Sequence, residues 1–249
     1  MGLSSNVLWH QTKKEGFFKI LSCKKMLYSY SLEKSLPLRD DQGVAYPMIS
    51  LSDIPICEMP NNKWTYGDYA IGFTREWSIR NGFAPVWYCE PNSVVYRLLH
   101  QLAIETLDKN DKNRFGNYMY LFSNVKFIES KLKTSRRTYE NYRFYDEREY
   151  RLVAQKPELD KHQYSPILIG GNYEKYKKEH NDKSLLEIGV DFTFKDIKYL
   201  IVKSEQNRTE VEDILKKDED ERHIHIFTKK EILEDFIGIE HNIEKKEVK

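Results

Sequence analysis

Short runs rich in β-branched and aromatic residues recur along the whole chain, and this recurrence most constrains the fold. Such runs are typical of strands when turn residues bound them. Between several of them, apolar residues repeat every three or four positions, as in amphipathic helices. This order of elements predicts an α+β fold with a central mixed, mostly antiparallel sheet flanked by helices. We expect one domain over residues 1–240 and a charged, frayed tail over residues 241–249.

Each predicted element corresponds to one segment of the sequence. Strands are expected at residues 6–12, 46–55, 70–73, 84–90, 147–155, 164–170, 194–204 and 223–228. Helices are expected at residues 13–22, 75–81, 93–107, 208–221 and 229–238, with Ser93 as an N-cap and Gly82 as a C-cap. Residues 31–46 read as a polar loop, residues 171–187 as a polar insert, and residues 120–133 as either helix or strand.

Charge and cysteine content limit the classes of partner. The 40 basic and 39 acidic residues leave a net charge of +1, which by itself predicts neither a nucleic-acid nor a membrane partner. Cys23, Cys57 and Cys89 form no CxxC pair, which argues against a zinc site and suits a reducing cytosol. The N-terminus lacks an apolar signal core, and no apolar run approaches the roughly 18 residues of a membrane span. We therefore expect a cytoplasmic protein without a bound metal or a membrane partner.

Polar residues at two predicted strands are candidates for ligand binding. His10 closes the first strand beside Thr12. A histidine there can hydrogen-bond a ribose hydroxyl, titrate or bind a metal, or it can simply lie at the edge of the core. Ser50 and Ser52 alternate with apolar residues, so both face the same side of their strand. In isolation that pattern is also typical of an ordinary strand with one polar face.

A third candidate region surrounds the predicted strand at residues 70–73. Gly72 lies inside this apolar strand, where it marks either the close approach of a ligand or packing near a bulge. Tyr66 and Tyr69 precede the strand, and either ring could stack on a flat ligand.

The segment FYDEREYRLV, residues 144–153, places carboxylates at the entry of an apolar strand. Glu147 and Glu149 are expected on one strand face, with Arg148 on the other. A carboxylate there could orient a ribose hydroxyl and stabilise an oxocarbenium-like centre. The alternative is a salt-bridged strand end, for which three arginines lie close enough in the sequence: Arg143, Arg148 and Arg151.

Four of these stretches, in this order, resemble the AbiGi family of abortive-infection, phage-resistance proteins. The family shows segments like HFT, SFCDIP, YGxYGIGxxKEWGIxxGxxPVxY and FYDEREWR. The corresponding residues here are His10–Thr12, Ser50–Pro55, Tyr66–Trp77 and Phe144–Arg151. The resemblance covers roughly residues 6–155. It implies a role in phage defence, and the family's antitoxin label implies a cognate toxin or antitoxin protein as partner.

A weaker resemblance is to ADP-ribosyltransferases, which place a His or Arg on the first strand, a Ser-x-Ser or a Tyr on a middle strand, and a Glu on a late strand. The residues that follow this order here are His10, then Ser50 and Ser52 or Tyr66 and Tyr69, then Glu147 and Glu149. It implies an ADP-ribosyltransferase-like fold and NAD as the substrate. Glu149, in preference to Glu147, would support the cationic transition state. The residues that would bind NAD are His10, Thr12, Ser50, Ser52, Tyr66 and Tyr69. The acceptor would be a protein or a nucleic acid. The basic and aromatic segment Lys131–Arg143 suits contact with a single nucleic-acid strand, but it equally suits a solvated surface, so it does not decide between the two acceptors.

Three functional hypotheses follow from these observations. The first is an ADP-ribosyltransferase-like effector that cleaves NAD and modifies a macromolecule during infection. The second is a non-catalytic antitoxin or other partner-binding component of an abortive-infection system. The third, which no recognisable spacing supports, is a nuclease that holds a metal with Asp53, Glu147 and Glu149.

Overall fold

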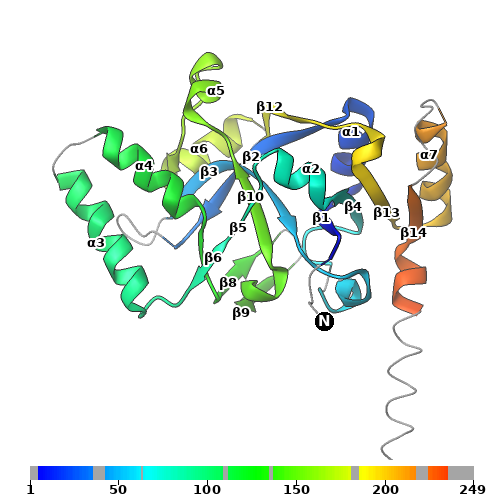
Figure 1. Cartoon of the computed structure of the whole chain (residues 1–249), viewed down its shortest axis with the longest axis horizontal. Helices are drawn as coiled ribbons and strands as arrows, with labels where there is room; N and C mark the ends of the chain where they lie inside the picture. Colours follow the sequence, from blue (N-terminus) through cyan, green and yellow to red (C-terminus); the bar gives the residue numbers. More distant parts are fainter. Residues whose placement is uncertain are drawn as a thin grey trace, which may run out of the picture.

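A large mixed sheet forms the centre of the protein (Figure 1). The computed structural model describes residues 5–35, 43–62, 64–108, 112–134, 137–180, 185–216 and 224–234. The predicted tail and the predicted domain boundary at residue 240 lie outside these ranges. Within them, the strand order along the main path of the sheet is β12 (Leu185–Asp191), β2 (Lys25–Glu33), β3 (Val44–Ser52), β1 (Val7–Thr12), β4 (Tyr69–Thr74), β13 (Ile197–Val202) and β14 (His225–Thr228).

Three further strands join the sheet beside this path. Strand β10 (Glu149–Val153) pairs with β3 and β5 (Ala84–Pro85), and β11 (Leu168–Ile169) pairs with β3. Neighbouring strands are antiparallel except β13 and β14, which are parallel. Two small sheets pair β6 (Trp87–Cys89) with β7 (Val125–Phe127), and β8 (Glu129–Lys133) with β9 (Thr138–Arg143). The predicted α+β class with a mixed, mostly antiparallel sheet is confirmed.

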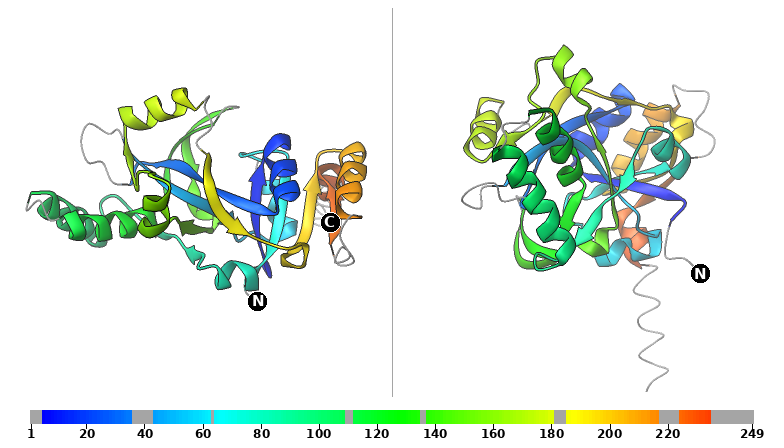
Figure 2. Two further views of the ribbon diagram at one scale, coloured as in Figure 1. Left: turned by 90° about the horizontal axis from the view of Figure 1, so that it is seen from above. Right: turned by 60° about the vertical axis from the view of Figure 1, so that its left-hand side comes forward.

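Helices lie around the sheet and at both ends of the molecule (Figures 1 and 2). They are α1 (Lys14–Cys23), α2 (Arg75–Arg80), α3 (Val94–Asp108), α4 (Lys112–Ser123), α5 (Lys156–Lys161), α6 (Gly171–Glu179), α7 (Glu205–Leu215) and a last helix at residues 229–234. Helices α3 and α4 extend from one end of the sheet, and α7 lies at the other. No helix in the described ranges combines the length and apolar character needed to cross a membrane.

Local sequence signals place several of these helices correctly. Helix α1 buries Phe17 and Leu21 against the sheet. Helix α3 begins after Ser93, whose hydroxyl accepts a hydrogen bond from the backbone N–H of Tyr96, as the predicted N-cap requires. Gly82 follows α2 with φ +86°, a left-handed conformation that glycine adopts without strain.

The prediction of a polar loop at residues 31–46 was wrong at both ends, because residues 31–33 end strand β2, which was missed, and residues 44–46 begin β3; residues 36–42 lie outside the described ranges. Lys24 ends α1 in the left-handed conformation, with φ 48°. The chain then reverses into β2, where Met26, Tyr28 and Tyr30 alternate with less buried residues. The helix-like spacing of apolar residues up to Leu27 concealed this alternation.

The strand at residues 84–90 and the polar insert at residues 171–187 were predicted only in part, and the segment at residues 120–133 was left open between helix and strand. The single strand expected at residues 84–90 is two short strands, β5 and β6, that belong to different sheets. The segment expected as helix or strand is both, because α4 gives way to β7 and β8. The polar insert at residues 171–187 contains α6, and its residues 181–184 lie outside the described ranges.

Candidate functional site

Strands β1 and β2 share one edge of β3 and diverge along it. Strand β2 pairs with β3 as far as Met48, whereas β1 pairs with β3 at Ser52. Both lie on the same edge, because Met48 and Ser52 pair on their other side with Val153 and Glu149 of β10. Between those two points, no described strand pairs with this edge of β3 at residues 49–51. The sheet is therefore open at this place.

A cavity of about 360 Å³ occupies the opening. Pockets for small molecules begin at roughly this size. Its walls come from α1, β1, β2 and β3 and from a cluster of charged side chains beside β10. The predicted site residues that line it are His10, Thr12, Ser50, Ser52, Tyr66, Glu147 and Glu149. The structure thus gathers residues from four separate stretches of the sequence around one cavity.

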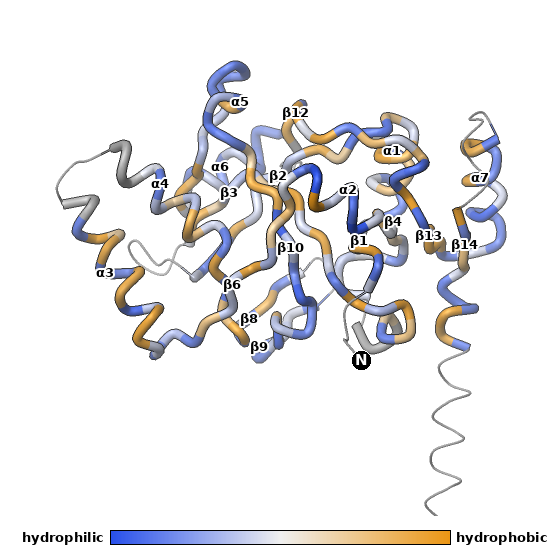
Figure 3. Tube along the Cα trace, in the orientation of Figure 1, coloured by the Kyte–Doolittle hydropathy of each residue, from blue (hydrophilic) through white to orange (hydrophobic). Residues whose placement is uncertain are grey.

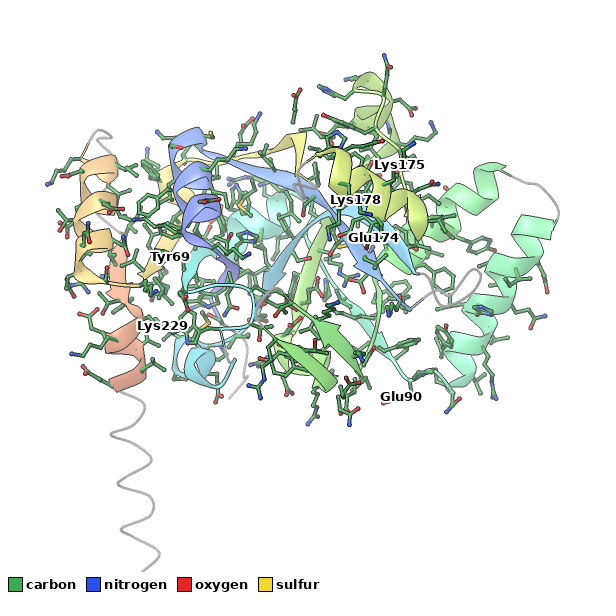
Figure 4. The ribbon with its side chains drawn as sticks, turned by 180° about the vertical axis from the view of Figure 1, so that it is seen from behind. Tyr69, Glu90, Glu174, Lys175, Lys178 and Lys229 are labelled. Carbon is green, nitrogen blue, oxygen red and sulfur yellow. The ribbon has the colours of Figure 1, made fainter. Side chains whose placement is uncertain are left out.

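Tyr69 is the predicted site residue that lies away from this cavity. Its ring packs against Phe17 and Phe18 of α1, with centroid distances of 5.3 and 6.3 Å. Its hydroxyl donates a 2.8 Å hydrogen bond to Asn207 Oδ1 of α7. Figure 4 labels Tyr69 beside α1. This tyrosine therefore contributes to the packing of α1 and α7 on the sheet.

Gly72 serves packing as well. A Cβ atom at this position would lie 3.0 Å from the ring of Trp9. The neighbouring pairing of β4 with β13 also shifts its register here. Of the two alternatives for Gly72, packing near a bulge is the one that the structure shows.

The expectation that Glu147 and Glu149 share a strand face was wrong. Glu147 ends the 3₁₀ turn η2 (Phe144–Glu147), and Arg148 follows with φ 44°. Strand β10 begins only at Glu149. The left-handed residue between the two glutamates turns the chain, so both carboxylates reach the same cation, Lys126 of β7, at 3.6 and 2.7 Å.

A buried ionic network surrounds Glu149. Arg151 Nε lies 2.7 Å from Glu149 Oε1, and Lys126 Nζ lies 2.7 Å from Oε2. Arg151 also contacts Glu33 of β2 at 2.5 Å and donates to the carbonyl of Ser123 at the end of α4. The Arg151 side chain is fully buried. Because buried charges need partners, this network explains how the strand entry tolerates its carboxylates.

The network gives its two glutamates opposite pKa shifts. Burial alone would raise the pKa of Glu149, but Arg151 and Lys126 outweigh burial and lower that pKa strongly. For Glu147, burial dominates over the more distant Lys126, and Glu149 adds repulsion, so its pKa is raised. Glu149 is therefore a fixed negative charge at neutral pH, whereas Glu147 is the better suited of the two to exchange a proton.

Two tyrosines hold Glu147 in place. The hydroxyls of Tyr66 and Tyr142 donate to Glu147 Oε1 at 2.7 and 2.9 Å. Burial, followed by the charge of Glu147, raises the pKa of both tyrosines. Tyr66 precedes Gly67, where a Cβ atom would overlap the carbonyl oxygen of Thr12 at 1.9 Å. Glycine at this position therefore allows the loop with Tyr66 to approach the end of β1.

His10 lies at the opening itself. Its Nδ1 is 3.2 Å from the carbonyl oxygen of Ser50, and the two residues belong to the diverging strands β1 and β3. Burial lowers the pKa of His10, although the contact with Ser50 opposes this shift. The ring is therefore held mainly neutral, which suits hydrogen bonding to a polar ligand as well as to the backbone.

Among the cavity residues that sequence reasoning did not name as site residues are Gln11, Glu33 and Lys126. Lys126 stands between Val125 and Phe127 in a short apolar run, and this position was the available signal for a buried cation. Glu33 ends the strand that was itself missed. Arg151, by contrast, was among the expected partners of the glutamates, and this expectation is confirmed.

Asp53, which the metal-nuclease hypothesis combined with Glu147 and Glu149, does not line the cavity. It forms an ion pair with Arg75 at 2.5 Å and accepts from the backbone N–H of Ser5. No group of three or more His, Cys, Asp or Glu side chains in the described ranges is placed to hold a metal ion.

A second notable surface is the outer side of α3. Val94, Leu98 and Leu102 recur at four-residue spacing and, with Val95, form what we call the α3 apolar face. Their exposed fractions are 60, 56, 41 and 64% respectively, whereas Tyr96 and Ala103 of the same helix are buried. Figure 3 shows the apolar segments along α3 at one end of the molecule. Contiguous exposed apolar residues of this kind mark interaction surfaces in soluble proteins.

The fold and these two features define a class of protein: an α+β protein with a mixed, mostly antiparallel sheet that opens around a charged cavity, and with an exposed apolar helix face at one end. A family model described as "Putative abortive phage resistance protein AbiGi, antitoxin" matches residues 24–203. The chain belongs to the AbiGi family. The match begins after His10 and extends beyond residue 155, and it shares residues 24–155 with the expected range of roughly 6–155.

No curated protein and no solved structure matches the chain. The resemblance to the AbiGi family is confirmed, whereas the resemblance to ADP-ribosyltransferases stays a prediction.

Proposed function

We propose that this protein is the antitoxin-type, partner-binding component of an abortive-infection system, and that it neutralises a cognate toxin protein by direct contact. The observation that carries the proposal is the α3 apolar face, which presents four large aliphatic side chains to solvent on one helix. The family description, which includes the word antitoxin, supports the same conclusion. A protein partner that covers this face would remove apolar area from water, which is the main favourable term in association.

The α3 apolar face lies on a helix whose other side is anchored. Tyr96 packs edge-to-face against Phe127 of β7, with ring centroids 5.2 Å apart. Ala103 and Leu99 belong to the cluster that includes Phe122 of α4. The face is therefore presented on a supported helix, and a partner need not order it on binding.

A charge placed in the α3 apolar face should abolish neutralisation. We expect Leu98→Asp to weaken toxin binding by about 2 kcal/mol or more, because a partner that covers this position must bury an unpaired charge. The measurement is growth of cells that co-express the chain with the toxin protein proposed as its partner, sought among the products of neighbouring genes, followed by the dissociation constant of the purified pair. Ile79→Asp on α2 is the matched control, because Ile79 is 60% exposed but lies outside the α3 apolar face.

Neutralisation by wild type and Ile79→Asp, together with its loss in Leu98→Asp, would support the proposal. Equal neutralisation by both variants would exclude the α3 apolar face as the contact. Failure of the wild-type chain to restore growth would exclude the antitoxin function.

A second candidate function is an ADP-ribosyltransferase-like enzyme that cleaves NAD and modifies a protein or nucleic acid. The cavity favours it, because His10, Ser50, Ser52 and Tyr66 lie together with Glu147 and Glu149. In such a reaction the bond between ribose C1′ and nicotinamide breaks. An acceptor nucleophile then bonds to C1′ and loses its proton. Glu149 would supply the fixed negative charge, but its oxygens already contact Arg151 and Lys126 and would have to share those contacts with the substrate.

Calorimetric titration with NAD tests this second function. If the cavity takes NAD, we expect micromolar binding that His10→Ala weakens about tenfold, because one hydrogen bond to a ribose would be lost. Glu147→Gln is the preferred variant for turnover, because it keeps the size of the side chain and its acceptor oxygen. Absence of heat with folded wild-type protein would remove NAD from consideration and leave the partner-binding function untouched.

A further inference from the structure

Gln11 is a cavity residue whose side-chain amide forms no hydrogen bond within the described structure. Both its side-chain nitrogen Nε2 and its side-chain oxygen Oε1 are buried, and neither has a hydrogen-bond partner there. Gln11 lines the cavity. A buried amide that leaves both donor and acceptor unpaired costs free energy, and an unpaired buried group in a native structure calls for an explanation.

The strand register places Gln11 at the opening. Trp9 pairs with Ser52 in the antiparallel ladder of β1 and β3, so continuation of that ladder would place Gln11 opposite Ser50. The strands diverge before this pair forms. Because side chains alternate along a strand, Gln11 lies on the same face of β1 as Trp9. Ser52 also pairs with Glu149, so this face is shared with the glutamate of the ionic network.

We propose that the sheet opening is a binding site for a small planar molecule with a hydrogen-bond donor beside an acceptor, and that Gln11 recognises this pair. A glutamine amide forms two parallel hydrogen bonds with such an edge, as it does with adenine bases in nucleic acids. A carboxamide or a nucleobase carries this chemistry, and a cavity of about 360 Å³ accommodates either. Ser50 and Ser52 supply hydroxyls on the adjoining strand.

This site is separate from the α3 apolar face, so the inference goes beyond toxin binding. It touches the transferase alternative at one point only: the nicotinamide group of NAD is a carboxamide, so it is one of the ligands that this site could bind. Binding of adenine without nicotinamide would leave the site in place while counting against NAD cleavage. Binding of nicotinamide alone would favour the transferase alternative.

The test is ligand-observed NMR and calorimetry with four probes on the full chain. Adenine, used as its 9-methyl derivative so that the N9–H beside N3 is removed, and nicotinamide carry the donor–acceptor pair. Their uncharged counterparts without it are 9-methylpurine and N,N-dimethylnicotinamide. We expect at least one of the first two to bind, and its matched counterpart to bind at least about tenfold more weakly. Equal binding of both members of each pair, or no binding of adenine and nicotinamide at millimolar concentration, would overturn the proposal.

Gln11→Met separates recognition from a structural role. Methionine keeps the volume of glutamine but has neither donor nor strong acceptor, so the free protein should remain folded with an unchanged or higher melting temperature. We expect the binding of the preferred probe to fall at least about tenfold. Gln206→Met is the control, because Gln206 is exposed on α7, away from the cavity. Unchanged binding to a folded Gln11→Met variant would overturn the proposal.

Discussion

Replacing Arg151 with methionine should lower the free energy of unfolding by about 3–5 kcal/mol. Arg151 is the buried cation that joins Glu149 of β10 to Glu33 of β2 and to the carbonyl of Ser123. Methionine fills much of the space but leaves the carboxylates without this partner, and Lys126 alone cannot serve both. The measurement is urea denaturation followed by circular dichroism, with the midpoint and slope compared between variants.

Arg143→Met is the control for this experiment. Arg143 also pairs with a carboxylate, Asp146 at 3.4 Å, but both side chains are largely exposed. Solvent weakens such a pair, so its loss should change stability by no more than about 0.5 kcal/mol. A loss below about 1 kcal/mol for Arg151→Met would mean that the network is not a structural requirement.

The same network limits what the substitution Glu149→Ala could show about catalysis. Removing Glu149 would leave Arg151 and Lys126 competing for Glu33 and Glu147 in a buried site. Loss of activity in that variant would then report unfolding as readily as loss of chemistry. A stability measurement must accompany any functional result at this position.

Trp77→Ala is the second substitution with a large expected effect, a loss of about 3–5 kcal/mol in the free energy of unfolding. The Trp77 ring is 1% exposed and stacks on Phe73 with centroids 4.4 Å apart. Its indole N–H donates to the carbonyl of Asp191 at 3.3 Å. Truncation would leave a cavity between α2, β4 and the end of β12. Thermal and urea denaturation check this prediction.

Trp87→Ala provides the matched comparison, because Trp87 is 54% exposed. The same truncation there removes little buried contact, so we expect a change within about 0.5–1 kcal/mol. Similar losses for both tryptophans would contradict the assignment of Trp77 to the core. A large loss for Trp77→Ala would also show that Trp77, the last residue of the family-like segment Tyr66–Trp77, serves the stability of the fold.

Elements governed by local sequence could be predicted. The N-cap at Ser93, the apolar repeat of α1 and the glycine after α2 each act within a few residues, and each is found where the sequence indicates. Strand β2 could not be separated from α1 by periodicity, because the break depends on one left-handed residue, Lys24.

The candidate site likewise contains residues that a local pattern reveals and residues that only contacts between distant segments bring together. Its residues on β1, β3 and the glutamate segment could be named from the sequence, since unusual polar residues in apolar strands are visible there. The burial of Lys126 had a local signal, but its partners did not, and Glu33 had no signal at all, because both residues join the network only through contacts between distant strands. Tyr69 lies outside the cavity because its ring packs against α1 and its hydroxyl bonds to α7, and the sequence around Tyr69 does not predict these contacts.

Strand β3 pairs with four others, and this has a consequence for the synthesis of the chain. Its partners β2 and β1 are close in sequence, but β10 and β11 are made on the order of a hundred residues later, and such distant contacts slow folding. A nascent chain that ends before β10 exposes the second edge of β3. Until β10 is synthesised and pairs with β3, that edge can pair with other chains. The unfinished protein therefore depends on chaperones or rapid elongation to avoid aggregation.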